Sequence, residues 1–208
     1  MEHRIIVVGI GPGSPDYLPP IAKRQIDAAK VLVGSRRALA AFAPDGAVTR
    51  VIDRHLDELL AFVRSSLATD DVVVMVSGDP GFYSLLVRLR LEFRPEAITV
   101  IPGISSVQLA FARLACPWQD ADLISLHGRE ADADALAYRP EKKLGILTDD
   151  QHHPGHIAGL LLAGGWPADS RVWLCSDLSY PNEQVMALTL AEVSERYDRE
   201  HCVMVVEA

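Results

Sequence analysis

Short runs of branched apolar residues alternate along the first half of the chain with segments in which apolar residues recur every three or four positions. The runs occupy residues 5–9, 31–34, 48–53, 72–78 and 98–103. The periodic segments cover residues 56–67, 82–93 and 107–114. Continuous apolar runs are typical of parallel strands buried on both faces, whereas the periodic segments place their apolar residues on one face of a helix. The alternation predicts an α/β layer with a parallel sheet.

The pattern changes after residue 118. New apolar runs occupy residues 123–128, 143–148, 171–178, 183–189 and 201–208, and a clear helical segment covers residues 156–163. Only a Tyr-Pro-Asn turn precedes the run at 183–189, and this connection is too short for a parallel crossover. We therefore expect a mixed sheet here, and two α/β domains that comprise residues 1–114 and 115–208.

Composition and charge argue against a membrane protein, a secreted protein and a nucleic-acid-binding protein. The chain has 208 residues, of which 49% are hydrophobic, and this is ample for packed cores. No stretch approaches the roughly 20 apolar residues of a membrane span, and the start, MEHRIIVV, lacks a secretory pattern, so we expect a cytoplasmic protein without a membrane anchor. The net charge of −8, with dispersed cations, argues against nucleic acid as the main partner.

The three cysteines, Cys116, Cys175 and Cys202, lie far apart, and each has apolar neighbours. No CxxC pair is present in the sequence. This usage is typical of reduced thiols in a protein core rather than of disulfides or a metal site.

The stretch IIVVGIGPGSPD, residues 5–16, carries a glycine turn directly after the first predicted strand. Such a turn exposes backbone N–H groups and lets a ligand approach the main chain closely. Its spacing is GxGPG rather than the GxGxxG of nicotinamide dinucleotide sites, Pro12 removes an N–H, and no acid ends the second strand at Gly34. A nicotinamide site is therefore disfavoured, whereas a turn that only packs strand on helix stays open. The next helix is expected from Leu18, with Asp16 as its N-cap.

Two further loops of this kind follow predicted strands, SGDPGFY at residues 77–83 and IPGISS at residues 101–106. The carboxyl ends of parallel strands lie at one edge of a sheet, where ligands bind, so we expect the three loops to converge there. Asp79 is placed to meet a ribose hydroxyl or an amino group, or instead to cap a helix that begins near Phe82. Ser105 and Ser106 are suited to helix N-caps as well as to ligand contacts.

As a set, GIGPGSPDYL, SGDPGFY and PGISS resemble the tetrapyrrole (corrin/porphyrin) methylase family. The resemblance spans the whole chain. It implies two α/β domains with a cleft between them, in which S-adenosylmethionine is the methyl donor. Within the family, HGR at residues 127–129 and DLSYPNEQ at residues 177–184 resemble the members that methylate carbon 5 of a corrin precursor in cobalamin biosynthesis. Asp177 stands where the family pattern has Asn, which puts one side-chain hydrogen bond of that turn in doubt.

The resemblance also implies which residues bind the two substrates. Cofactor contacts are expected at Ile10, Gly11, Pro12, Gly78, Asp79, Phe82, Ser105, Ser106, Leu147, Thr148, Leu178 and Met204. His127 and Arg129 are expected to bind the carboxylates of the macrocycle. Arg36 and Arg37 are further candidates that a solvated surface explains equally well. No catalytic side chain is named, because methyl transfer is an in-line displacement that requires positioned partners rather than a nucleophilic residue.

Three histidines, His152, His153 and His156, lie together at the start of a predicted helix, directly after two aspartates. A zinc site needs three or four ligands in a defined geometry, and no further ligand can be assigned here. We therefore expect a solvated helix cap and no metal.

The resemblance further implies a homodimer and a corrin-type tetrapyrrole as substrate. Because the chain ends at Ala208, methylation at carbon 15 and the accompanying decarboxylation are expected to belong to a separate protein. Two alternatives stay open. One is a methyltransferase of the same fold that acts on another tetrapyrrole, RNA or protein, and the other is a non-catalytic nucleotide-binding module.

Overall fold

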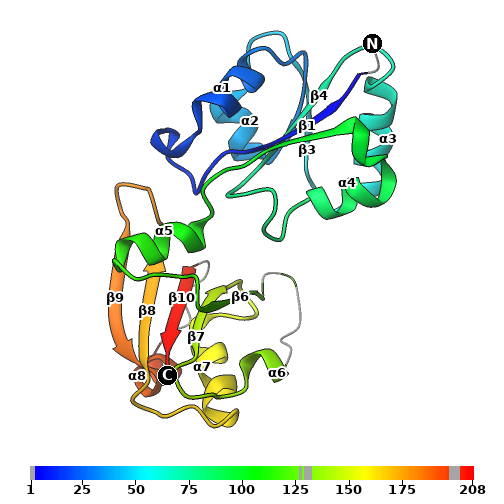
Figure 1. Ribbon diagram of the computed structural model, residues 1–208. Coiled ribbons are helices and arrows are strands. Elements are labelled where there is room, and N and C mark those ends of the chain that lie inside the picture. Colours follow the sequence, from blue (N-terminus) through cyan, green and yellow to red (C-terminus); the bar gives the residue numbers. More distant parts are fainter. Residues whose placement is uncertain (1–2, 127, 129–132, 197–201) are drawn as a thin grey trace. The chain divides into compact units, whose positions relative to one another are not determined.

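The computed structural model describes residues 3–126, 128, 133–196 and 202–208 (Figure 1). The chain forms two compact units, Met1–Ser105 and Ser106–Ala208. The sequence placed this boundary after residue 114. The structure instead assigns the helix α5 (Ser106–Arg113) to the second unit, because Val107 and Phe111 pack against the sheet of that unit.

The first unit contains a parallel sheet. Among the described residues this sheet has five strands, in the order β3-β2-β4-β1-β5, and every pairing is parallel. The strands are β1 (Ile5–Gly9), β2 (Val31–Gly34), β3 (Val48–Val51), β4 (Val72–Val76) and β5 (Ile98–Ile101). The helices are α1 (Pro20–Asp27), α2 (Arg36–Phe42), α3 (Leu56–Ser66) and α4 (Leu86–Glu92), with short 3₁₀ helices at Pro15–Tyr17 and Pro95–Ala97. The strands predicted for this half are confirmed.

Helices cover both faces of the first sheet, and β4 shows why its sequence is apolar throughout. Val72, Val74 and Val76 pack in one core with residues of α3 and α4. Val73 and Met75 pack in a second core with residues of α1 and α2. Successive side chains of a strand point to opposite faces, so a strand that is covered on both sides must be apolar at every position.

The second unit contains the predicted mixed sheet. Among its described residues the strand order is β6-β7-β10-β8-β9, in which only β6 and β7 pair in parallel. The strands are β6 (Ala121–Ser125), β7 (Lys143–Leu147), β8 (Arg171–Ser176), β9 (Gln184–Thr189) and β10 (Cys202–Glu207). The antiparallel pairing of β8 with β9 confirms what the short Tyr-Pro-Asn connection predicted.

One face of the second sheet packs against α7 (Pro154–Ala163) and α8 (Leu190–Arg196), and the short helix α6 (Ala133–Leu136) adds Leu136 to the same core. The opposite face carries α5. A Cβ at Gly145 of β7 would lie 2.8 Å from Phe111 Cε2 and 3.0 Å from Val107 Cγ1. The helix therefore packs this closely because β7 has no side chain at that position. Of the helices in the described part of the chain, none is long and apolar enough to cross a membrane.

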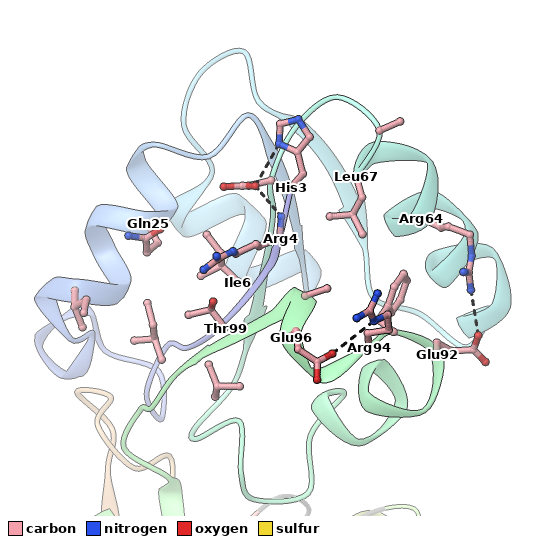
Figure 2. Close-up of a pocket in the computed structure, with 17 residues that line it drawn as sticks. His3, Arg4, Ile6, Gln25, Arg64, Leu67, Glu92, Arg94, Glu96 and Thr99 are labelled. Carbon is pink, nitrogen blue, oxygen red and sulfur yellow. Dashed lines mark hydrogen bonds and ion pairs between the residues drawn. The ribbon is translucent and has the colours of Figure 1, made fainter. Parts of the chain in front are cut away.

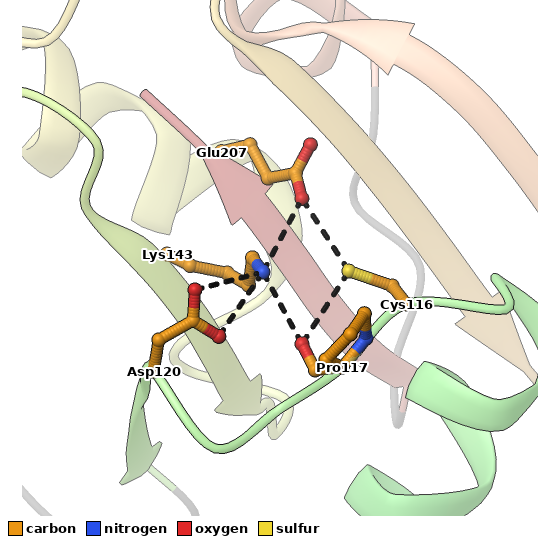
Figure 3. A network of polar contacts seen from close by, with 5 residues as sticks. All are labelled: Cys116, Pro117, Asp120, Lys143 and Glu207. Carbon is orange, nitrogen blue, oxygen red and sulfur yellow. Dashed lines mark hydrogen bonds and ion pairs between the residues drawn. The ribbon is translucent and has the colours of Figure 1, made fainter.

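A polar network joins the loop after α5 to two strands of the second sheet (Figure 3). Lys143 Nζ, at the start of β7, donates to Pro117 O at 3.2 Å and to Asp120 Oδ1 at 3.3 Å, and lies 3.8 Å from Glu207 Oε1 at the end of β10. Cys116 Sγ donates to the same Pro117 and Glu207 oxygens, at 3.5 Å each. The network thus ties the chain that leaves α5 to the end of the sheet.

The cysteines are free thiols, as predicted. Burial raises the pKa of Cys175 to about 12 and that of Cys202 to about 11, so neither is a thiolate at neutral pH. Cys116 is only partly buried and not part of a core, but burial and its hydrogen bond to Glu207 raise its pKa as well.

Two expected helix starts are wrong, and both errors have local causes. The helix predicted from Phe82 begins at Leu86 as α4, because Tyr83 has a φ of +48°, which no right-handed helix accepts. Asp16 is not an N-cap. Ser14 Oγ accepts the N–H of Asp16 at 3.2 Å and caps the 3₁₀ helix that precedes α1.

Gly145→Ala should destabilise the second unit by about 1–3 kcal/mol, because the new methyl group overlaps Phe111 and Val107 in a packed interface. Gly159→Ala in α7 is the matched control. A Cβ at Gly159 meets nothing within 4 Å, and alanine in place of a helical glycine stabilises by roughly 0.5–1 kcal/mol. Urea unfolding followed by circular dichroism measures both changes. Equal effects of the two substitutions would contradict the close packing of α5.

Candidate functional site

Three loops leave the carboxyl edge of the first sheet next to one another. They follow β4, β1 and β5, which are neighbours in the strand order, and comprise residues 77–83, 10–14 and 102–105. Ligands of open parallel sheets bind outside the carboxyl ends of the strands, so this edge is the candidate site of the first unit. Backbone contacts between the loops confirm their predicted convergence.

Gly9, Gly78 and Gly103 meet where their backbones leave no room for side chains. A Cβ on Gly9 would lie 2.6 Å from Gly103 N and 2.7 Å from Gly78 O. A Cβ on Gly103 would lie 2.8 Å from Gly9 Cα and closer still to Gly78 O. Real Cβ atoms essentially never come this close to other atoms, so both positions require glycine. These three residues form what we term the glycine junction.

Backbone hydrogen bonds extend the glycine junction to Gly11. Gly11 N donates to Gly78 O at 3.3 Å, and Gly78 N donates to Gly11 O at 2.9 Å. Gly11 and Gly78 have φ values of +77° and +68°, in the left-handed region that favours glycine. Two main-chain hydrogen bonds therefore join the loops after β1 and β4.

The side chain of Asp79 braces the glycine junction. Its Oδ1 accepts from Gly81 N at 2.7 Å within its own loop, and its Oδ2 accepts from Gly103 N at 2.9 Å in the loop after β5. The alternative role as a helix cap near Phe82 is wrong, because α4 begins only at Leu86. A cofactor contact of Asp79 stays a prediction, and it would use the lone pairs that these two N–H groups leave free.

The other predicted contacts of the first unit surround the glycine junction. Ile10 is buried, and its N–H continues the hydrogen bonding of β1 with β4. Ser105 is buried as well, and its Cα lies 3.3 Å from where a Cβ of Gly78 would be. Pro12 and Phe82 are partly buried. The structure thus brings these residues to one edge, while their contact with a cofactor stays a prediction.

The predicted contacts of the second unit lie near the carboxyl end of β7. Thr148 Oγ1 donates to Cys202 O and accepts from Cys202 N, both at 2.9 Å, and this fixes the start of β10 beside the end of β7. Leu147 is partly buried, and Leu178 is buried. Met204 is completely buried in the core, so its side chain has no surface to offer a ligand.

The predicted substrate residues His127 and Arg129 lie outside the described residues. Arg36 and Arg37 are exposed at the start of α2. That helix follows the carboxyl end of β2, and so it begins at the same edge of the sheet as the glycine junction. Their contact with a substrate stays a prediction.

Asp149, which follows β7, has a role that no motif of the sequence indicated. Its Oδ2 accepts from Gly128 N at 2.7 Å, and its Oδ1 accepts from the N–H groups of Gln151 and His152 at 2.9 and 2.6 Å. These backbone hydrogen bonds, with that of Gly128 foremost, lower the pKa of Asp149 to about 2. Asp149 therefore joins the turn after β7 to the loop after β6.

The histidines beside α7 have structural contacts. His153 is the N-cap of the helix, and its Nδ1 accepts from His156 N at 3.3 Å, which confirms the predicted helix cap. His152 is buried, with its ring 5.7 Å from that of His156. Within the described ranges, no group of three or more His, Cys, Asp or Glu side chains could hold a metal ion.

The turn between β8 and β9, residues 177–183, has a strained backbone. Asp177 and Ser179 have φ values of +51° and +75°, a conformation that costs a non-glycine residue about 1–3 kcal/mol. Asp177 Oδ2 accepts from Asn182 Nδ2 at 2.7 Å. The turn thus forms with Asp177 in place of the family's Asn, and its carboxylate makes a side-chain hydrogen bond.

Glu183 joins this turn to α5, the helix that Ser106 opens. Its Oε2 accepts from Ser179 N at 2.7 Å. Arg113, the last residue of α5, donates to its carboxylate through both Nε and Nη2, and these hydrogen bonds lower the pKa of Glu183. No sequence pattern indicated this pair, because its members lie 70 residues apart.

A broad hollow of about 1590 Å³ lies elsewhere in the first unit (Figure 2). It follows the edge strand β5, and its lining includes Arg4 and Asp71 at the amino ends of β1 and β4, opposite the glycine junction. Arg64 and Glu92 pair on its wall at 3.3 Å. An open surface with paired charges is a poor candidate for a cofactor despite its size, because cofactor sites are concave and carry convergent polar groups.

A sequence profile of the family described as tetrapyrrole (corrin/porphyrin) methylases matches residues 4–194. The chain belongs to this family. It is 32% identical over 203 residues to the cobalt-precorrin-7 C(5)-methyltransferase of Salmonella typhimurium, covering 98% of this chain and 99% of that protein. The precorrin-6Y C(5,15)-methyltransferase (decarboxylating) of a Sinorhizobium species is 33% identical over 183 residues, which are 87% of this chain but 44% of that longer protein. The resemblance based on sequence motifs is confirmed.

Solved structures agree with the fold. The precorrin-6Y methylase from Archaeoglobus fulgidus is 28% identical, with a TM-score of 0.74 over 99% of this chain and 98% of that chain. A uroporphyrin-III C-methyl transferase from Thermus thermophilus, complexed with S-adenyl homocysteine, is 25% identical, with a TM-score of 0.79 over 98% of this chain and 91% of that chain. The predicted fold class, with one parallel and one mixed α/β sheet, is confirmed.

Asp79→Ala should lower the free energy of unfolding of the first unit by about 1–3 kcal/mol, because the N–H groups of Gly81 and Gly103 lose their acceptor. Asp16→Ala, at an exposed aspartate, is the matched control and should stay within about 0.5 kcal/mol of the wild type. Chemical unfolding gives the magnitude, and amide hydrogen exchange at Gly81 and Gly103 gives the place. Exchange that is unchanged at both N–H groups would rule out the brace.

Acid should destabilise the second unit partly through Asp149. Its pKa is about 2 in the folded chain against an ordinary 3.8, so its stabilising contribution is complete above about pH 4 and is lost as the pH falls toward about 2. Asp149→Asn should therefore be less stable than the wild type at neutral pH and lose less stability over that interval. Thermal melts across the interval test this, with Asp150→Asn at the exposed neighbour as control. Parallel curves for wild type and Asp149→Asn would contradict it.

Proposed function

We propose that the chain transfers a methyl group from S-adenosylmethionine to carbon 5 of a corrin precursor, of the precorrin-6Y or cobalt-precorrin-7 type. The observation that carries the proposal is the glycine junction with its Asp79 brace, in a chain of the tetrapyrrole methylase family. The Salmonella relative, named for carbon 5 and matched over nearly its whole length, favours that position of the ring.

The residues at the carboxyl edge fit S-adenosylmethionine. The three loops bring main-chain groups to the surface and contain one carboxylate, that of Asp79, but no lysine or arginine. A pyrophosphate would meet repulsion from this carboxylate, because the loops contain no cation to offset it. A nucleoside with hydroxyl and amino groups and a positively charged sulfonium is the complementary kind of ligand. The Thermus relative, solved with S-adenyl homocysteine, supports this choice.

Methyl transfer requires the protein to position the two reactants and does not require a reactive side chain. S-adenosylmethionine supplies an electrophilic methyl group when it is bound. The glycine junction fixes main-chain groups in place, and glycine has no side-chain entropy to lose when they are fixed. In the second unit, Thr148 holds the end of β7 beside the start of β10. Well-oriented partners gain effective molarities on the order of 10⁵ M or more, and an in-line displacement benefits directly from such positioning. The raised pKa values of Cys175 and Cys202 are consistent with a mechanism that uses no thiolate.

The wider setting of the enzyme is part of the proposal. His127 and Arg129 bind carboxylates of the macrocycle, and Arg36 and Arg37 are further candidates that a solvated surface explains equally well. The enzyme works as a cytoplasmic homodimer. A separate protein methylates carbon 15 and removes the carboxyl group. The Sinorhizobium relative supports a link between the two reactions, because its name includes both positions.

Two alternatives to this function predict different properties of the protein. A methyltransferase acting on RNA would need a positive surface, and the net charge of −8 disfavours it. A non-catalytic module would bind the cofactor and transfer nothing.

Calorimetric titration of the purified chain with S-adenosylhomocysteine should show binding in the micromolar range, weakened in Asp79→Ala and absent for NAD. Incubation with S-adenosylmethionine and either precorrin-6Y or cobalt-precorrin-7 should then add one methyl group to the macrocycle, as mass spectrometry measures. No binding at millimolar S-adenosylhomocysteine would overturn the cofactor site. Binding without transfer to either macrocycle would overturn the substrate and favour the non-catalytic module.

A further inference from the structure

We infer that Arg113 and Glu183 are a positioning pair for the cofactor, which holds the turn 177–183 in its binding conformation against α5. The inference rests on the proposed function, because Leu178 in the turn and Ser106 on α5 are both proposed cofactor contacts. The pair therefore connects two segments that bind the same ligand. Neither residue is proposed to touch that ligand itself.

The geometry of the pair is specific. The Glu183 carboxylate accepts hydrogen bonds from Arg113 Nε and Nη2, the latter at 3.1 Å, and from Ser179 N at 2.7 Å. The two side chains are 36% and 19% exposed, so water only partly screens them. A guanidinium that donates two parallel N–H groups fixes the orientation of a carboxylate, which a single point charge does not do. Glu183 thereby transmits the position of α5 to the main chain of the turn.

The turn needs such a restraint because its backbone is strained. Asp177 and Ser179 both adopt positive φ, on either side of Leu178. Strained residues of this kind persist only where the surrounding structure holds them. Ser179, whose N–H Glu183 accepts, is one of the two strained residues. Loss of the pair therefore acts directly on the conformation beside Leu178.

Chain reversal alone does not require a turn of this length. The antiparallel register of β8 and β9 places Ser176 opposite Gln184, so the seven residues 177–183 connect two strands that are already adjacent. Antiparallel neighbours are commonly joined by two residues. The length of the turn and its tie to another helix go beyond what a reversal needs, and both suit a turn that presents main-chain groups to a ligand.

Release of the turn should weaken binding without abolishing it. When only a fraction of the molecules holds the binding conformation, the apparent Kd rises by the inverse of that fraction. In Glu183→Gln the side chain keeps its size and an acceptor oxygen but loses its charge. We expect the Kd for S-adenosylhomocysteine to rise about five- to tenfold, which is the scale of coupling between contacting residues.

Titration of the full chain with S-adenosylhomocysteine tests this against a matched control. Asp122→Asn removes another arginine partner of the second unit, since Arg139 Nη2 lies 2.9 Å from Asp122 Oδ2, and it should leave the Kd unchanged. Amide exchange of Ser179 in the unliganded chain should accelerate in Glu183→Gln but not in Asp122→Asn. This second readout needs no ligand.

A double-variant cycle separates positioning from a general loss of structure. The effects of Arg113→Gln and Glu183→Gln on Kd should not add, because both weaken the same contact. Additive effects, or an unchanged Kd in Glu183→Gln while the wild type binds, would overturn the inference. If the wild type itself fails to bind, the proposed function fails, and the exchange of Ser179 still decides whether Glu183 restrains the turn.

Discussion

The close approach of three backbones at Gly9, Gly78 and Gly103 is the constraint on which the candidate site of the first unit depends. These residues stand at or just beyond the carboxyl ends of three neighbouring strands, and a Cβ at Gly9 or Gly103 would overlap backbone atoms. Neighbouring strands lie about 4.8 Å apart, so their loops can meet this closely only by bending toward one another past the last ladder hydrogen bonds. The resulting surface is formed by main-chain groups, whose positions the sheet itself determines.

A carboxylate that follows a strand secures the loops in each unit. Asp79 accepts one N–H from its own loop and one from Gly103, while Asp149 accepts two from its own turn and one from Gly128. A carboxylate has two oxygens and about four acceptor positions, so one short side chain can hold two loops at once. Glu183 repeats this arrangement in the turn after β8, where the arginine of α5 takes the place of a second backbone segment.

Burial determines the element pattern, which is why the sequence predicts it well. The runs IIVVG and VLVG define β1 and β2 to the residue, because strands covered on both faces have no polar position. The wrong helix starts come from local backbone conformation and capping, which the spacing of apolar residues does not indicate. Phe82 has the spacing of a helix start, but the positive φ of Tyr83 delays α4 to Leu86. Ser14 displaces Asp16 as a cap because its hydroxyl reaches an N–H two residues on.

The candidate site also has a part that the sequence predicts and a part that it does not. Its loops are predictable, since glycine and proline directly after an apolar run mark the ends of strands. The hydrogen bonds that tie these loops together are not predictable. Asp79 and Gly103 lie 24 residues apart, and Asp149 and Gly128 lie 21 apart. In each case the donor is a backbone N–H, which nearly every residue carries, so the sequence does not single out the partner. The first role to consider for an acidic residue shortly after a buried strand is therefore that its carboxylate accepts backbone N–H groups from a neighbouring loop. The tie also holds main-chain donors and acceptors in fixed positions, and the proposed cofactor site depends on that order.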